Sequence, residues 1–278
     1  MSQFINLHLH SNRSDGVLEP EQLLQLVKQK KLQAFSVTDH DTLEGYHAVK
    51  ELLVDSDPEL IPGIELSVEL GSEDMHLLAY LLDPTDRVFV SALDEFRERR
   101  NERGRIMVQK LRELGLDISF GAVEEAAMGA VVGRPHVADA MHRLELVRTY
   151  EEAFYKYIGN GRPAYVPHSR LKPKEAILLV HNAGGVAVMA HPFVAEMYKQ
   201  IEMMVAVGLD GLEIYHYSHT TTQVEQLQHL ADRFGLIQTG GSDFHGRENR
   251  EGEIGSQKVP VQLLDRLKKK AEEIRGLN

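Results

Sequence analysis

The chain has 278 residues, of which 42% are hydrophobic and 26% are charged, as is typical of a globular protein with a large core. The absence of cysteine excludes disulfide bonds and thiolate chemistry, and no run of about 20 apolar residues indicates a membrane span. The net charge of −11 argues against an extended nucleic-acid surface, and we expect a cytoplasmic protein with no membrane partner.

Strands and helices alternate over the first part of the chain. Ile5, Leu7 and Leu9 alternate with polar residues, which predicts a strand on which His8 and His10 share one face. We then expect a helix from Pro20, a strand over 34–38, a helix over 44–54, and strands over 60–68 and 75–82. This order predicts βα units that form a parallel sheet or a barrel.

From about residue 86 to residue 162 the hydrophobic pattern is helical throughout. The βα pattern resumes at 164–166, and we expect further strands over 185–190 and 209–215, from 236, and near 254–259, with helices between them. The predicted fold is an α/β barrel domain formed by residues 1–100 and 164–278. A small all-helical domain, residues 101–163, is inserted into it.

Side chains that can bind metal ions lie where the predicted strands end. They are His8, His10, Asp15, His40, Glu65, His76, His191, Asp243 and His245. The carboxyl ends of parallel strands meet on one face of a βα fold, so these residues are expected to converge there. Imidazole nitrogens and carboxylates suit zinc, manganese or iron. Because one cation needs about four to six ligands, nine ligands suit two or three cations.

A single His-x-His pair is weak evidence for a metal site. At this histidine content such a pair arises by chance about 0.7 times, and a buried histidine more often forms a core hydrogen bond than binds a metal. Five strand ends, however, carry a histidine directly after an apolar run. Because polar groups are costly to bury unless a partner satisfies them, this recurrence favours a shared metal site.

Four motifs follow one another along the chain: His8-x-His10 with Ser14-Asp15-Gly16, then Thr38-Asp39-His40-Asp41, His191-Pro192, and Ser242-Asp243-x-His245. This series resembles the motifs of the polymerase and histidinol phosphatase (PHP) family. The resemblance implies a distorted (β/α)7 barrel and a phosphoesterase site with two or three divalent cations. We expect manganese, with zinc, iron or magnesium as alternatives. By the same resemblance one cation is bound by His8, His10, Glu65 and Asp243, a second by Asp15, His40 and His245, and a third by Glu65, His76 and His191.

The helical insertion narrows the expected substrate. Its turns at 133–136 and 161–165 are similar to those of the amidohydrolase-like PHP subgroup, which includes nucleoside 3′,5′-bisphosphate phosphatases and 5′-3′ exoribonucleases. We expect a small-molecule nucleotide substrate, a nucleoside 3′,5′-bisphosphate such as adenosine 3′,5′-bisphosphate, whose 3′-phosphate is removed by attack of metal-bound hydroxide. The alternatives are a 5′-3′ exoribonuclease on short 5′-phosphorylated RNA, a histidinol-phosphate-type phosphomonoesterase, and a degenerate structural module without activity.

A second phosphate requires an anchor away from the metals, and arginine binds phosphate through two parallel hydrogen bonds. Arg134 is the first candidate because free backbone N–H groups at the start of its helix also favour anions. Arg99, Arg103 and Arg162 are weaker candidates, and Asp15 and His40 are expected to adjoin the substrate as well as the metal. For most arginines of 97–112 the simpler interpretation is a solvated helix face paired with glutamates.

Proton transfer to the leaving group is the least determined part of the prediction. His191, Asp39 or Asp41 could supply it, although Asp39 and Asp41 are equally suited to orienting His40. Base-stacking candidates are Tyr155, Tyr157 and Phe193. The remaining histidines receive no predicted function: His47, His142, His168, His181, His216, His219 and His229.

Overall fold

The computed structural model describes residues 4–70, 73–167, 171–247 and 252–277. The described strands are β1 (Phe4–Asn6), β2 (Ala34–Phe35), β3 (Glu59–Leu60), β4 (Gly63–Leu70), β5 (Glu73–Tyr80), β6 (Val186–Met189), β7 (Gly211–Tyr215), β8 (Ile237–Gly240) and β9 (Val259–Pro260). They form a sheet of order β3-β2-β1-β9 and a sheet of order β4-β5-β6-β7-β8. The fold is therefore mixed α/β.

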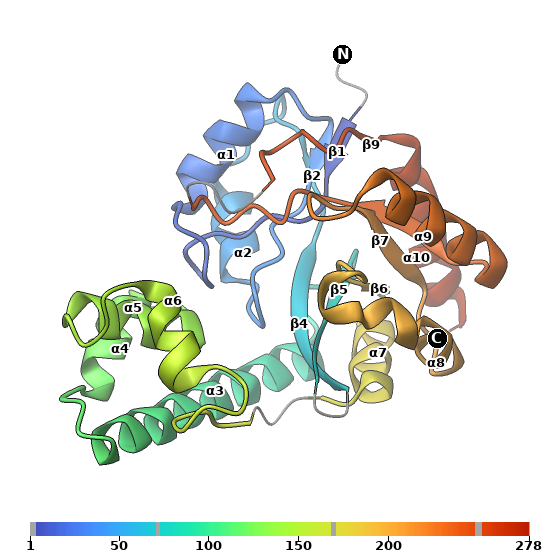
Figure 1. Cartoon of the computed structure of the whole chain (residues 1–278). Helices are drawn as coiled ribbons and strands as arrows, with labels where there is room; N and C mark the ends of the chain where they lie inside the picture. The colour runs from blue at the N-terminus through green and yellow to red at the C-terminus, as the bar shows by residue number, and fades with distance from the viewer. Residues whose placement is uncertain (1–3, 71–72, 168–170, 248–251, 278) are drawn as a thin grey trace.

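The helices lie around these sheets and in a separate lobe (Figure 1). They are α1 (Pro20–Gln29), α2 (Glu44–Leu52), α3 (Arg87–Glu113), α4 (Phe120–Ala127), α5 (Arg134–Arg143), α6 (Tyr150–Ala153), the π-helix η1 (Phe154–Ile158), α7 (Pro173–Asn182), the 3-10 helix η2 (Val194–Gln200), α8 (Ile201–Ala206), α9 (Thr221–Phe234) and α10 (Gln262–Leu277). Local signals explain several boundaries: Pro20 and Pro173 begin their helices, and Thr220 caps α9, which ends at the left-handed Gly235.

The βα order predicts parallel strands, but both sheets are mixed. β5 runs antiparallel to both β4 and β6, whereas β6, β7 and β8 are parallel to one another. Only two residues separate β4 from β5, and so short a connection joins antiparallel strands, because a parallel crossover needs a dozen residues or more.

Segments that follow β1 and β2 are joined by backbone hydrogen bonds to the two edges of the five-stranded sheet, near β8 and β4, and these seams carry several of the predicted ligands. The donor and acceptor residues are Leu7 to Gly240, Asp243 to His8 and His10 to Phe244 at one edge, and Asp41 to Glu65 at the other. Strand ends that are distant in the sequence are thereby brought together. Closure into one (β/α)7 barrel stays a prediction.

The helical lobe has its own hydrophobic core, built from buried residues between Met107 and Ala164. The long helix α3 connects it to the sheets: Phe89 packs in the core against β4 and β5, whereas Leu111 packs in the lobe. The predicted domain boundary after residue 100 falls inside this continuous helix. Among the described residues, no helix combines the length and apolar character needed to cross a membrane.

Residues 164–166 are described in the structure but do not form the expected strand. The carbonyl oxygens of Tyr165 and Val166 instead accept hydrogen bonds from the side chains of Lys110 and Arg103 on α3, at 2.9 and 2.8 Å. The backbone is satisfied by a helix rather than by a neighbouring strand. Likewise, of the strand expected near 254–259, only the short β9 forms.

Candidate metal centre

The first group of possible ligands combines the two histidines after β1 with carboxylates from β4 and from the loop after β8. The Nε2 atom of His8 lies 3.1 Å from Nε2 of His10 and 3.2 Å from both Glu65 Oε2 and Asp243 Oδ1. His10 Nε2 lies 3.1 Å from the same two oxygens. Ligand atoms around a tetrahedral cation with bonds of about 2.1 Å are about 3.4 Å apart. These four atoms could therefore hold one cation.

A second group lies around Asp15, in the loop between β1 and α1. Asp15 Oδ1 is 3.2 Å from His245 Nε2 and 3.8 Å from His40 Nε2. His10 Nδ1 also lies 3.8 Å from this oxygen, so the group adjoins the first one. One imidazole from each of two loops and a carboxylate could hold a second cation.

The third group uses the other oxygen of Glu65. Glu65 Oε1 is 2.9 Å from His76 Nδ1 and 3.2 Å from His191 Nε2, and the two histidine nitrogens are 3.3 Å apart. Glu65 is 1% exposed and places Oε2 in the first group and Oε1 in the third. This single carboxylate therefore links two groups.

The backbone leaves its regular conformation where it carries these ligands. His191 and Asp243 have φ values of +28° and +51°, in the left-handed region that most residues avoid. Such strain is concentrated at functional sites, where the surrounding structure holds it in place. Gly241 is required for a different reason, since a Cβ atom there would lie 2.4 Å from the backbone nitrogen of His8.

The charges in the cluster stabilise one another. Burial disfavours protonation of His10, but hydrogen bonds to Asp243 and Glu65 outweigh it and raise the pKa of His10 to about 10. Burial also opposes ionisation of Glu65, yet the imidazoles of His40, His76 and His8 hold its pKa well below the usual range. A ligating imidazole is neutral, so a cation drawn in by these carboxylates would displace the protons.

His40 differs from its neighbours because burial dominates and lowers its pKa to about 3, despite Glu65 and Asp15. A lowered pKa favours the neutral imidazole, which is the form that binds a metal ion. The Nδ1 atoms of His10 and His40 are buried and have no hydrogen-bond partner among the described residues. His40 Nδ1 lies 3.3 Å from Glu65 Oε2. Because buried polar atoms normally form hydrogen bonds, these two nitrogens without hydrogen bonds and the mixed nitrogen and oxygen donor set fit divalent cations.

Asp39 forms hydrogen bonds with the loop that carries Asp15. It accepts hydrogen bonds from the backbone N–H of Ser11 at 2.8 Å and from the hydroxyls of Ser11 and Ser14 at 2.6 Å each. Burial raises the pKa of Asp39, although His10 and these hydrogen bonds favour its ionised form. Its contacts indicate that it fixes the loop. A role in proton transfer stays a prediction.

Asp41 connects the end of β2 to α3. Its Oδ1 accepts a hydrogen bond from the backbone N–H of Ser67 at 2.8 Å, and its Oδ2 forms an ion pair with Arg100 at 3.0 Å. Both partners of the ion pair are largely buried, so the contact ties the helix that leads into the lobe to the edge of the sheet that carries the candidate ligands.

Two residues on β7 or directly after it join the site without having been predicted. Glu213 Oε1 lies 2.9 Å from His8 Nδ1, and His216 Nε2 lies 3.3 Å from Asp243 Oδ2. The sequence contained a signal for each of them. Glu213 is a charged residue inside an apolar strand, and His216 directly follows that strand; both features could have indicated membership of the site. Of the other unassigned histidines, His181 pairs with Asp210 at 2.7 Å, and His168 lies outside the described residues.

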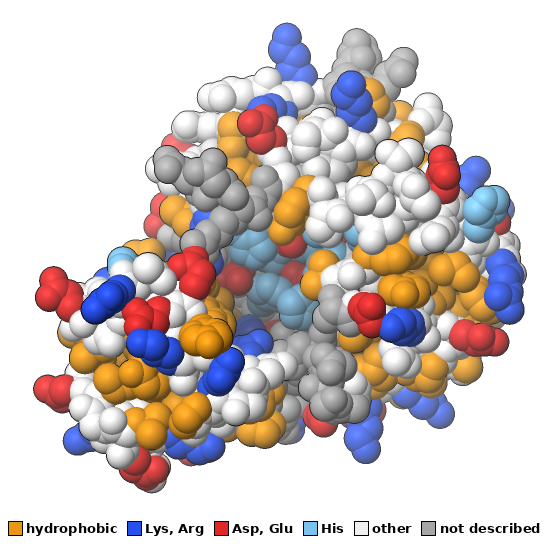
Figure 2. Space-filling model, in the orientation of Figure 1, with side chains coloured by type: hydrophobic (Ala, Val, Ile, Leu, Met, Phe, Trp, Pro, Cys, Tyr) orange, Lys and Arg blue, Asp and Glu red, His pale blue; other side chains and the backbone are white. Residues whose placement is uncertain are grey.

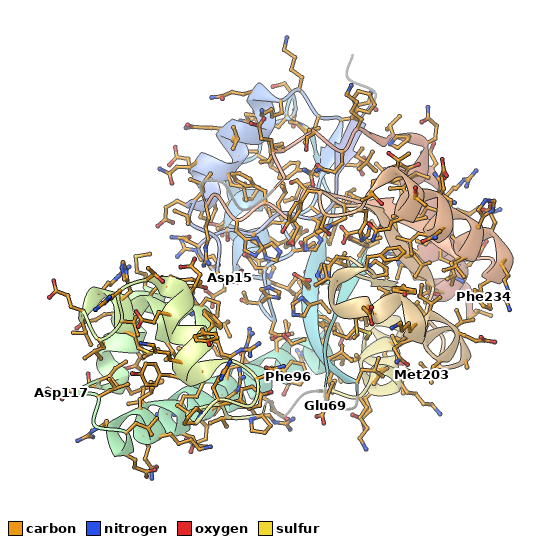
Figure 3. The ribbon with its side chains drawn as sticks, in the orientation of Figure 1. Asp15, Glu69, Phe96, Asp117, Met203 and Phe234 are labelled. Atoms are coloured by element: carbon orange, nitrogen blue, oxygen red, sulfur yellow. The ribbon has the colours of Figure 1, made fainter. Side chains whose placement is uncertain are left out.

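A cavity of about 330 Å³ adjoins Asp15 between the sheets and the lobe. Its polar lining includes Asp15, His136, Asp139, Arg143, Tyr150 and Arg247. Arg247 donates hydrogen bonds to the backbone oxygen of Asp15 at 2.9 Å and to the hydroxyl of Tyr150 at 3.1 Å. Histidine and acidic side chains gather in the hollow between the two parts (Figure 2), and Asp15 lies on the side that faces the lobe (Figure 3).

None of the four arginines predicted to bind substrate lines this cavity. Arg134 donates a hydrogen bond to Asn160 at 2.8 Å, and Arg162 lies over the ring of Tyr155 at 4.8 Å. Arg103 is buried and bonded to the backbone of Val166, and Arg99 pairs with Glu95 at the surface at 3.3 Å. Sequence reasoning missed Arg247, because its position depends on how the lobe packs against the loop of Asp15.

The three aromatic candidates have different surroundings. Tyr155 is 70% exposed, Tyr157 packs against the lobe core, and Phe193 stacks on Tyr198 with ring centroids 4.6 Å apart. Tyr155 is the most exposed of the three, and Arg162 lies over one face of its ring.

Comparison with known proteins gives a consistent set of relatives. The PHP domain model matches residues 6–186. A 3′,5′-nucleoside bisphosphate phosphatase from Chromobacterium violaceum is 30% identical over 257 residues, which is 90% of each chain. The 5′-3′ exoribonuclease Rnm from Escherichia coli is 29% identical over 86% of this chain and 84% of its own. The crystal structure of a presumed metal-dependent phosphoesterase from Bifidobacterium adolescentis superimposes with a TM-score of 0.85, at 29% identity over 96% of each chain.

Proposed function

Because the chain belongs to the PHP domain family and is a metal-dependent phosphoesterase of that family, we propose that it removes the 3′-phosphate of nucleoside 3′,5′-bisphosphates. The observation that carries this proposal is the cavity beside Asp15, which contains Arg143 and Arg247 next to the candidate metal ligands. The Chromobacterium violaceum relative, named for this activity, supports it.

The proposal includes the nine predicted ligands, in three groups of which the first and third share Glu65. We propose two or three divalent cations, manganese first. Divalent cations, when bound, supply an activated water and neutralise the phosphate oxygens. The hydrogen bonds at both edges of the sheets support a distorted (β/α)7 barrel, and the separate lobe core supports a helical insertion of about residues 101–163.

We assign the second phosphate to the cavity because arginines line it and because it lies beside Asp15. A guanidinium has five N–H donors, and the contacts of Arg247 with Asp15 and Tyr150 use two of them. Donors therefore remain for a phosphate, with Arg143 as a second cation on the cavity wall. The lining also includes Val17 and Met128, whose apolar surfaces would contact the nucleoside and exclude water from it.

A 5′-3′ exoribonuclease is the second candidate, and a surface of the lobe favours it. Tyr155 is exposed beneath Arg162, and Arg134 lies 5.8 Å from the ring of Tyr165. Aromatic rings beside arginines stack the bases of single strands, so a short 5′-phosphorylated RNA could extend across them. A histidinol-phosphate-type substrate would leave the cavity arginines without a phosphate, and a purely structural module would have no use for this ligand set.

Substrate comparison tests the proposal. The quantities compared are kcat/KM values for a nucleoside 3′,5′-bisphosphate, the matching 3′-monophosphate and a short 5′-phosphorylated oligonucleotide. We expect the bisphosphate to exceed the monophosphate by at least about tenfold, because charge-assisted hydrogen bonds contribute about 1.5–3 kcal/mol. Equal values for bisphosphate and monophosphate would contradict recognition of a second phosphate. A clear preference for the oligonucleotide would favour the exoribonuclease.

Arg247→Met should lower kcat/KM for the bisphosphate by about 10- to 100-fold, because methionine retains much of the length of the side chain but none of its N–H donors. Hydrolysis of the 3′-monophosphate, which needs the metal centre but not the second-phosphate contact, should change little. The matched control is Arg233→Met on the exposed face of α9. Equal losses on both substrates would assign Arg247 to the loop of Asp15 instead of the substrate.

A further inference from the structure

Glu213 occupies the middle of β7, between the buried residues Leu212 and Ile214, and is 0% exposed. We propose that Glu213 is a positioning residue of the metal centre, which sets the tautomer of His8 and the backbone of His191. This inference rests on the proposed function only in requiring that the cluster binds cations. It assigns a role to a residue that is not itself one of the candidate ligands.

The burial of Glu213 requires an explanation. An ionised carboxylate is costly to bury, and a pair with a buried partner often gives no more stability than apolar residues of similar volume. Both oxygens of Glu213 are nevertheless used: Oε1 lies 2.9 Å from His8 Nδ1, and Oε2 accepts a hydrogen bond from the backbone N–H of His191 at 2.8 Å. Each contact reaches a candidate ligand. A role in placing those ligands accounts for the charge.

The contact with His8 determines which of its nitrogens faces the cluster. An ionised carboxylate only accepts hydrogen bonds, so Nδ1 of His8 carries a proton, and in the neutral, metal-binding form of His8 the lone pair is on Nε2. That Nε2 atom is the one 3.2 Å from both Glu65 Oε2 and Asp243 Oδ1. Partners of this kind orient metal-binding histidines and raise their basicity.

The contact with His191 holds a strained turn. His191 has a φ of +28°, and its backbone N–H is fixed by Glu213 directly after β6. The imidazole of His191 then lies 3.2 Å from Glu65 Oε1, in the third group, whereas His8 belongs to the first. A single carboxylate on β7 therefore sets the positions of ligands from two groups.

Glu213→Gln separates this role from packing. Glutamine has nearly the same shape but only one acceptor oxygen. Two donors, Nδ1–H of His8 and the backbone N–H of His191, each require an acceptor at this position. Either the N–H of His191 loses its partner, or the amide donates to His8 Nδ1 and moves the histidine proton to Nε2, where it blocks a cation. Loss of such a partner lowers metal affinity by about 10- to 100-fold. We expect the dissociation constant for Co²⁺ to rise by this factor.

Asp210→Asn provides a matched control. Asp210 is also buried and also contacts a histidine and a backbone N–H: its Oδ2 lies 2.7 Å from His181 Nε2 and accepts from Ala187 at 2.9 Å. It belongs to none of the three groups. The purified variants are titrated with Co²⁺, and the visible absorption of the bound ion is followed. Asp210→Asn should bind Co²⁺ as the wild type does. Unchanged affinity in Glu213→Gln, or equal losses in both variants, would overturn the proposal.

A measurement on the unaltered chain covers the case in which Glu213→Gln does not fold. In Zn²⁺-loaded protein, ¹⁵N NMR of the histidine side chains should show His8 with its proton on Nδ1. A proton on Nε2 would overturn the assignment. Both experiments report on metal binding rather than turnover. A chain that shows these results but hydrolyses no bisphosphate would contradict the proposed substrate and support the role of Glu213.

Discussion

Glu65→Gln is expected to lower turnover at least about 10³-fold, the largest effect of any single substitution in this chain. Divalent cations contribute several kcal/mol to phosphoester hydrolysis, and each 1.36 kcal/mol corresponds to a factor of ten. Glu65 contacts His8 and His10 with one oxygen and His76 and His191 with the other. Its replacement removes the only carboxylate common to the first and third groups among the described residues.

The measurement for Glu65→Gln combines steady-state turnover with metal analysis of the same sample. Bound metal should fall by at least one equivalent. The control is Glu69→Gln on the same strand, since Glu69 is exposed and lies at the far end of β4 from the cluster (Figure 3). That variant should retain both metal and activity. Full metal content and normal turnover in Glu65→Gln would exclude the shared-carboxylate arrangement.

Asp243→Asn should have the second largest effect, with a similar loss of turnover and of about one metal equivalent. Asp243 Oδ1 lies 3.2 and 3.1 Å from the Nε2 atoms of His8 and His10. Burial opposes ionisation of Asp243, but the charges of His8 and His245 hold its pKa well below the usual value. Asparagine is neutral, so it balances the charge of a cation less well. The measurement is metal content together with kcat.

Asparagine is chosen so that the substitution adds no backbone strain that could itself change the metal content or kcat. Asp243 has a φ of +51°, which asparagine adopts as readily as aspartate, whereas alanine would add strain of about 1 kcal/mol or more. Thermal unfolding in excess chelator should therefore be close to that of the wild type, which checks that the fold persists. Asp232→Asn on the exposed part of α9 serves as the neutral control. Wild-type metal content in Asp243→Asn would remove this residue from the ligand set.

The candidate ligands could be predicted because their signals are local. His8 and His10 stand two residues apart in an alternating apolar strand, and His191 and Asp243 follow apolar runs at strand ends. Parallel strands bring such ends together without further information. The order of the four motifs indicated the PHP family, and the match over residues 6–186 confirms it.

The remainder of the site depends on contacts between distant segments. Glu213 is 205 residues from His8, and its function as a partner arises only once β7 lies beside β6. Arg247 meets Tyr150 because the lobe packs against the loop of Asp15. Arg134 shows the converse: its place at a helix start was correctly predicted, but the structure engages it with Asn160 and places it outside the cavity.

The prediction of secondary structure from the sequence was limited in the same way. The antiparallel orientation of β5 follows from a two-residue connection, which the pattern of hydrophobic residues does not report. The expected strand at 164–166 fails because Lys110 and Arg103 on α3 satisfy its carbonyl groups. Hydrogen bonds to residues distant in the sequence thus outweighed the local preference of residues 164–166 for a strand.

Metal analysis of the wild-type chain, purified without chelator, tests the central claim most directly. The three groups of ligands, of which the first and third share Glu65, predict two to three equivalents of divalent transition metal per chain, with manganese the first expected. Less than one equivalent, in protein that is folded and has been supplied with manganese during expression, would contradict the multinuclear centre on which the proposed phosphatase depends.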